Sequence, residues 1–388
     1  MEIGTQELPF AAAEERLHEQ ARAMTGLADF GDSEYLEGLR HWLRSLDVDA
    51  ELSAAGRRMV LGMTLTALAG RLESEASLAA HPQVRRARLE RPFVILGLPR
   101  TGTTVLHRML CRDPRNQGLE LWLGHSPQPR PSRATWDDTS AYQRCQKLQE
   151  VAQQLTPAMA QIHAMAADAP DECWNLLRQS FRTVTFECSA GVSGYARWWS
   201  TCDMRKAYAR FTDNLRLIGA NDRHRRWVLK DPSHLFAPEA LLEAVPEALL
   251  VMTHRDPAKS IPSVCSLTAT ARRQNDRVFD AAVLGAEQNA LWIRGLERTL
   301  ALRKREPERF VDIHFDAIRE DPLAAIREIY ARAGVAEDAA AEAAIREFVE
   351  THPTQAHHYT AEEYGLSPAS IRERYASYIE QAGVRLED

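Results

Sequence analysis

The strongest constraint on the fold is an apolar segment that ends in a glycine-rich turn and continues into a helical pattern. Residues 93–96 are all apolar, the turn runs from Gly97 to Gly102, and residues 103–110 carry apolar side chains at helical spacing. A short, unbroken apolar run is typical of a strand that is buried on both faces of a parallel sheet. The segment therefore predicts a buried strand, a tight loop and a helix in direct succession.

Three further short, mostly apolar runs repeat this arrangement. They cover residues 227–229, 249–252 and 310–313, and each precedes a turn and a helical segment. Strands that alternate with helices favour a parallel sheet. We therefore predict an α/β fold, a P-loop-type parallel sheet flanked by helices, that binds its ligands beyond the carboxyl ends of the strands.

The rest of the sequence predicts mostly helices, as the spacing of Leu36, Leu39, Trp42, Leu43 and Leu46 illustrates. We expect an N-terminal helical region (1–88), a P-loop core (89–335) with a helical insertion at about 130–222, and a C-terminal helical segment (336–388). No internal repeat and no low-complexity linker interrupts these parts.

Charge and composition argue against several classes of protein. The net charge of −6 disfavours broad binding of nucleic acid or of anionic membranes. No apolar run reaches about 18 residues, so we expect no integral membrane protein, and the N-terminus lacks a secretory pattern, which favours a cytoplasmic location. The six cysteines form neither a C-x-x-C pair nor a zinc spacing, so we predict free thiols and no metal. The sequence leaves the oligomeric state open, and a homodimer is compatible with it.

The turn after the first strand nearly matches the phosphate-binding P-loop. Residues 97–104 read GLPRTGTT, whereas the nucleotide motif is G-x-x-x-x-G-K-[ST]. Backbone N–H groups of such a loop and the dipole of the following helix attract an anion. Thr103 replaces the lysine that clamps a nucleoside triphosphate, and Arg100 supplies a cation instead. Taken alone the loop is a weak signal, because threonines at a helix start also serve as caps.

Cations also follow the next two predicted strands. Lys230 directly follows the run at 227–229. Burial of its ammonium group there is costly unless an anion binds beside it. Arg255 follows the run at 249–252, and Ser263 lies eight residues further, about two helical turns into the next helix. Each of these residues alone could be solvated. Three cations at three consecutive strand ends indicate a ligand with more than one phosphate-like group.

These segments together resemble the sulfotransferase family, in particular its bacterial branch related to tyrosylprotein sulfotransferases. The resemblance implies that the donor is 3′-phosphoadenosine 5′-phosphosulfate (PAPS). It also implies a loop that grips the donor's 5′ end through Pro99, Arg100, Thr101, Gly102, Thr103 and Thr104. Arg255 and Ser263 resemble the pair that binds the 3′-phosphate, and Lys230 resembles the lysine that steadies the bridging oxygen.

The resemblance covers roughly residues 91–335 and has two departures. Cytosolic members carry a tryptophan that stacks on adenine near the place of Val105. They also have a late Arg-Lys-Gly segment for the 3′-phosphate, whereas residues 354–359 hold no Arg or Lys here. The adenine contacts and part of the 3′-phosphate site are therefore unassigned.

The implied activity is transfer of a sulfuryl group to a hydroxyl of a small acceptor by in-line displacement (EC 2.8.2 type), with no metal. The acceptor hydroxyl needs a general base, and the sequence offers His163, His234 and Glu120. Aromatic residues of the insertion suggest an apolar pocket for a lipid, sterol-like or aromatic alcohol, although aromatic side chains at helical spacing often belong to a core.

Two other functions compete with this interpretation. A P-loop kinase or NTPase with a degenerate loop would need a loop lysine and a Mg²⁺-binding acid at a strand end. Thr103 argues against it, and no predicted strand leads directly into an aspartate. A nucleotide-binding scaffold without catalysis is the second alternative, but a catalytically dead copy would more readily have lost Lys230 or Arg100.

Overall fold

The computed structural model of the chain describes residues 9–155, 166–351 and 359–387. The chain forms two compact units. A helical unit comprises Met1–Arg88, Glu120–Asp222 and Leu267–Phe279, and a sheet unit comprises Leu89–Leu119, Arg223–Ser266 and Asp280–Asp388.

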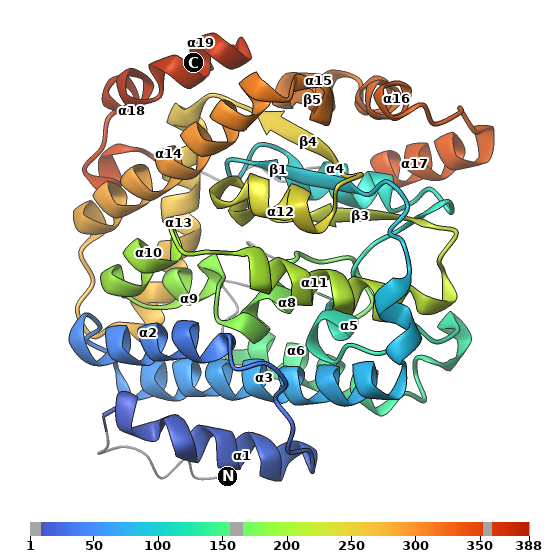
Figure 1. Cartoon of the computed structure of the whole chain (residues 1–388). Helices are drawn as coiled ribbons and strands as arrows, with labels where there is room; N and C mark the ends of the chain where they lie inside the picture. The colour runs from blue at the N-terminus through green and yellow to red at the C-terminus, as the bar shows by residue number, and fades with distance from the viewer. Residues whose placement is uncertain (1–8, 156–165, 352–358, 388) are drawn as a thin grey trace. The chain divides into compact units, whose positions relative to one another are not determined.

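The sheet unit is built on five parallel strands. They are β1 (Phe93–Gly97), β2 (Asn116–Gln117), β3 (Arg226–Lys230), β4 (Leu249–His254) and β5 (Phe310–His314). Their order in the sheet is β2-β3-β1-β4-β5. The predicted α/β fold with a parallel sheet is confirmed, and the four apolar runs are β1, β3, β4 and β5 (Figure 1).

β2 escaped the sequence analysis because it is polar and has only two residues. Asn116 is fully buried there, and its Nδ2 donates hydrogen bonds to Leu110 O at 2.9 Å and Tyr330 Oη at 3.0 Å. The two hydrogen bonds of this amide group, rather than an apolar pattern, therefore hold the edge strand in place.

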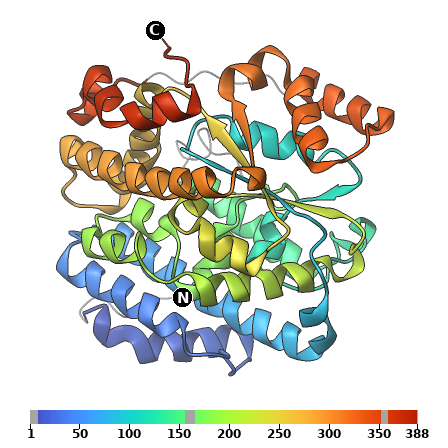
Figure 2. The same cartoon turned by 45° about the horizontal axis from the view of Figure 1, so that its top comes forward.

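Helices flank the sheet within the same unit (Figures 1 and 2). They are α4 (Thr103–Leu110), α12 (Pro238–Ala244), α14 (Ala281–Arg305), α15 (Phe315–Glu320), α16 (Pro322–Ala333), α17 (Ala339–Thr351), α18 (Pro368–Arg374) and α19 (Ala376–Ala382). Side chains of β1, β3, β4 and β5 pack against α4 and α15–α17, with residues such as Ile95, Leu106 and Ile326 in a single buried cluster.

Amphipathic segments form much of the helical unit. Its helices are α1 (Glu14–Thr25), α2 (Tyr35–Val48), α3 (Ala54–Ala80), α5 (Leu121–His125), α6 (Ser140–Leu155), α8 (Trp174–Leu177), α9 (Val184–Ser189), α10 (Ser193–Trp199) and α11 (Arg205–Ile218). α2 buries Leu39, Trp42 and Leu43 at helical spacing. The Ser53 side chain accepts a hydrogen bond from Gly56 N at the start of α3 and thereby caps that helix.

One helix belongs to both units. α13 (Pro257–Asn275) begins in the sheet unit and ends in the helical unit, the division falling after Ser266. None of the helices in the described ranges is long and apolar enough to cross a membrane. The six cysteines all lie in the described ranges, and none of them forms a disulfide there.

Candidate donor-binding site

The turn between β1 and α4 has the backbone of a tight anion-binding loop. Gly97, Arg100 and Gly102 adopt positive φ angles of 148°, 70° and 90°. A Cβ atom at Gly97 would lie 2.4 Å from Thr253 Oγ1, so β4 leaves room only for glycine. Thr101 Oγ1 donates to Leu98 O at 2.7 Å and lies 2.5 Å from Thr253 Oγ1, which ties the loop to β4.

The arginine of this loop meets the first part of α13. Arg100 Nε donates a hydrogen bond to Ser263 Oγ at 3.1 Å, and Arg255 Nη1 donates to Arg100 O at 3.1 Å. Burial lowers the pKa of the Arg100 guanidinium, and the positive charge of Arg255 lowers it further. The interaction with Tyr359 acts in the opposite direction and raises this pKa. Sequence reasoning placed Arg100 at the 5′ end of a donor and Ser263 at its 3′-phosphate, and the fold makes these two side chains neighbours.

Lys230 approaches the loop from the next strand. It pairs in register with Ile95 of β1, and its Nζ donates to Thr104 Oγ1 at 3.3 Å. Only 2% of the residue is exposed. The fold therefore brings the buried ammonium to the first turn of α4, where the helix dipole attracts an anion.

Arg255 already holds a carboxylate. Its Nε and Nη2 donate to the two carboxylate oxygens of Glu387 at 2.7 and 2.9 Å, and its guanidinium lies over the Phe315 ring at 4.0 Å. This two-pronged contact is the geometry with which arginine also binds phosphate. A carboxylate of the chain itself thus occupies the fork at which we expected the 3′-phosphate.

The C-terminal segment fastens this carboxylate. Arg372 Nη2 donates to Asp256 Oδ2 and to Glu387 O, both at 2.6 Å, and Glu387 N donates to Asp256 Oδ2 at 2.9 Å. Hydrogen bonds from Arg372, Glu387 and Ala258 outweigh burial and lower the pKa of Asp256. Sequence analysis missed Arg372 and Glu387, since they lie 116 and 132 residues from their partners and carry no motif.

The three candidate bases belong to different parts of the chain. His234 is fully buried in the turn after β3, and Glu120 belongs to the helical unit. The Glu120 carboxylate accepts hydrogen bonds from Arg130 Nε and Nη2 at 3.1 and 2.9 Å. His163 lies outside the described residues.

Basic rather than metal-binding side chains gather at this edge of the sheet. In the described part of the chain, no group of three or more His, Cys, Asp or Glu side chains could hold a metal ion. Arg100, Lys230 and Arg255 concentrate positive charge at the carboxyl ends of the strands, and the arrangement can bind a ligand with several oxyanions.

Comparisons with known proteins agree with this geometry. Residues 92–339 match the model of the "Sulfotransferase family". The crystal structure of sulfotransferase STF1 from Mycobacterium tuberculosis H37Rv is 37% identical, with a TM-score of 0.88 over 95% of this chain and 100% of that one. The crystal structure of sulfotransferase STF9 from Mycobacterium avium is 28% identical, with a TM-score of 0.90 over 98% and 99% of the two chains. No curated protein matches this chain.

Proposed function

The chain belongs to the sulfotransferase family, and on that premise we propose that it transfers the sulfuryl group of PAPS to a hydroxyl of a small, apolar acceptor. The observation that carries the choice of donor is the meeting of Arg100, Ser263 and Arg255 beside the loop at one edge of the sheet. A donor with phosphate groups at both its 5′ and 3′ positions matches cations that come from three different strand ends.

The roles follow from position. The loop N–H groups and Thr103 and Thr104 would hold the 5′ end at the start of α4, whereas Arg255 and Ser263 would hold the 3′-phosphate. The Glu387 carboxylate occupies the position on Arg255 that we assign to that phosphate. Its two hydrogen bonds support the proposal that an oxyanion binds to this guanidinium. The Arg100 backbone lies in the loop and its side chain reaches Ser263, so this residue would link the two ends of the donor.

The reaction is an in-line displacement at sulfur. The acceptor oxygen forms a bond to sulfur while the bond from sulfur to the bridging phosphate oxygen breaks, and the acceptor proton passes to a base. Negative charge builds on the leaving bisphosphate, where Lys230 and the loop amides stabilise it. His163, His234 and Glu120 are the candidates for the base. The ion pair of Glu120 with Arg130 makes that carboxylate less available as a base, which favours the two histidines.

Calorimetric titration with adenosine 3′,5′-bisphosphate, and separately with ATP plus Mg²⁺, tests the donor. We expect metal-independent binding of the bisphosphate and weak binding of ATP. A preference for Mg-ATP would instead favour a P-loop kinase or NTPase. Such enzymes usually carry a lysine at the loop position that Thr103 occupies in this chain.

Lys230→Ala tests the catalytic role. We expect sulfuryl transfer to fall by about 10²–10³-fold, because charge on the leaving group loses its buried ammonium, while bisphosphate binding survives in part. Lys304→Ala removes an exposed lysine of α14 and serves as the control. Full activity of Lys230→Ala would remove this residue from the mechanism.

A further inference from the structure

The helical unit buries five arginines among its described residues, and four of them form ion pairs with carboxylates of the same unit. The pairs are Arg71 with Glu34, Arg130 with Glu120 and Asp222, Arg182 with Glu34 and Glu37, and Arg272 with Glu187. Each of these buried positive charges is therefore matched by a negative charge of the chain.

The fifth is Arg178. Its guanidinium forms no hydrogen bond and no ion pair with any residue of the described ranges, although only 8% of the residue is exposed. It begins the short 3₁₀ turn after α8, and its guanidinium lies 5.6 Å from the centre of the Trp174 ring. The Asp171 carboxylate attracts the Arg178 guanidinium only at longer range. Asp171 instead accepts hydrogen bonds from Glu172 N and Asn175 Nδ2.

Two further side chains near Arg178 supply no negative charge. Asn175 Nδ2 donates to Glu172 O at 3.2 Å. Asn175 also forms a side-chain hydrogen bond with His125. Burial and the charge of Arg178 hold the pKa of His125 well below its usual range, so its ring is neutral and can donate one hydrogen bond.

A buried cation without a counter-charge is costly, by several kcal/mol in typical proteins. Burial lowers the pKa of Arg178 to about 10, so it still carries its charge at neutral pH. The same unit supplies a direct carboxylate partner to each of the other four buried arginines, so the absence of such a partner at Arg178 in the described ranges points to a ligand.

We propose that the Arg178 guanidinium binds an oxyanion of a small ligand, which therefore carries a carboxylate or comparable acidic group on an apolar body. The planar fork of arginine fits a carboxylate in two-pronged fashion, and Trp174 offers an apolar face beside it. This anion site does not rest on the proposed function.

The test uses benzoate and benzyl alcohol, which share a ring and differ in charge, at constant ionic strength. The protein is first given saturating adenosine 3′,5′-bisphosphate, so that anions do not act at the donor loop. We expect benzoate, but not benzyl alcohol, to raise the thermal midpoint of the wild type by about 2 °C at ten times its dissociation constant. In Arg178→Met this difference should disappear, and in Arg178→Lys, which keeps the charge, part of it should remain.

Equal effects of the two probes on the wild type would overturn the proposal. A benzoate effect that survives in Arg178→Met would overturn it as well. Failure of the donor assignment is distinguishable, because it would appear as absent bisphosphate binding in calorimetry while the benzoate preference persists. If Arg178→Met does not fold, the wild type and Arg178→Lys still test the proposal. If neither protein is stabilised more by benzoate than by benzyl alcohol, the anion site is rejected.

Discussion

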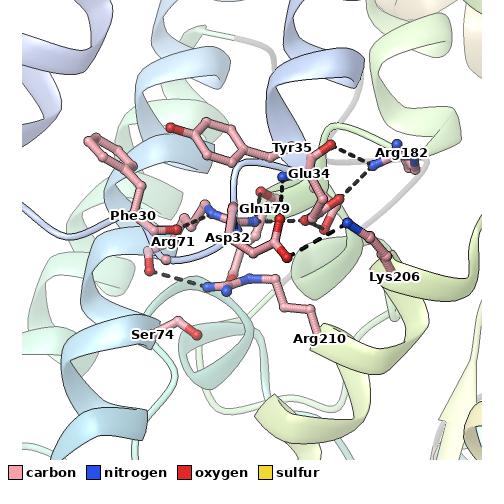
Figure 3. Close-up of polar contacts among 12 residues, drawn as sticks. Phe30, Asp32, Glu34, Tyr35, Arg71, Ser74, Gln179, Arg182, Lys206 and Arg210 are labelled. Carbon is pink, nitrogen blue, oxygen red and sulfur yellow. Dashed lines mark hydrogen bonds and ion pairs between the residues drawn. The ribbon is translucent and has the colours of Figure 1, made fainter.

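Arg71 and Arg178 are both buried arginines of the helical unit, yet their surroundings differ completely. Arg71 donates hydrogen bonds to three backbone carbonyl groups and to the Glu34 carboxylate, which also pairs with Arg182 (Figure 3). Arg178 directly precedes Gln179, whose carbonyl oxygen is one of those three acceptors. Even so, the Arg178 guanidinium has no acceptor of its own among the described residues.

A buried guanidinium therefore serves two different purposes in this unit. Arg71 is 1% exposed and its charge is matched inside the protein, so it holds helices together without a ligand. Arg178 is also buried, and no carboxylate of the described residues forms an ion pair with it. The first arrangement favours stability, whereas the second favours binding at the expense of stability.

Arg71→Met should give the largest loss of stability. It leaves the Glu34 carboxylate buried with one cation fewer, and breaking a buried pair in this way costs about 3–5 kcal/mol. The midpoint of urea unfolding measures the loss. An unchanged midpoint would contradict the view that the Glu34 contacts are structural.

Arg178→Met should act in the opposite direction. A pKa of about 10, well below the usual range of arginine, means that the folded state disfavours the charged form. Removal of the charge should therefore stabilise the unliganded protein by up to about 3 kcal/mol. The advantage should be complete below pH 10 and shrink as the pH rises above 10, where the wild type loses the proton. Unfolding midpoints of both proteins between pH 8 and 11 check this, and a destabilised variant would show that Arg178 has a structural partner.

Asp312→Asn extends the comparison to the sheet unit. Burial raises the pKa of the Asp312 carboxyl, but hydrogen bonds from His254 and Arg303 outweigh it and hold that pKa at about 2. A depressed carboxyl pKa contributes stability above the unfolded value, which is about 4, and loses it as the pH falls towards 2. We expect a loss of about 2 kcal/mol at pH 6 that vanishes near pH 2. A pH-independent loss would assign the effect to packing instead.

Glu387→Gln should have the smallest energetic effect. It removes the carboxylate that occupies the fork of Arg255, and a partly exposed pair of this kind is worth about 1 kcal/mol. Binding of adenosine 3′,5′-bisphosphate should therefore tighten about fivefold in calorimetry. Glu380→Gln, in helix α19, is the control. Weaker binding in Glu387→Gln would mean that Glu387 orients Arg255 rather than competing with the donor.

The amino-acid sequence was sufficient to predict the parallel sheet and the tight glycine-rich loop after its first strand. Four apolar runs, two glycines and the cations Arg100, Lys230 and Arg255 are local signals, because burial on both faces of a strand and a tight turn each restrict a few consecutive residues. The common direction of parallel strands then placed these cations at one edge.

Which charges are matched depends instead on tertiary packing. Arg255 meets Glu387 across 132 residues, and Arg71 meets Gln179 across 108, whereas Arg178 pairs with no carboxylate in the described ranges. β2 is likewise held by side-chain hydrogen bonds from distant segments. Periodicity reports only which side of an element is buried, and the partner of a buried charge depends on how elements far apart in the sequence pack together.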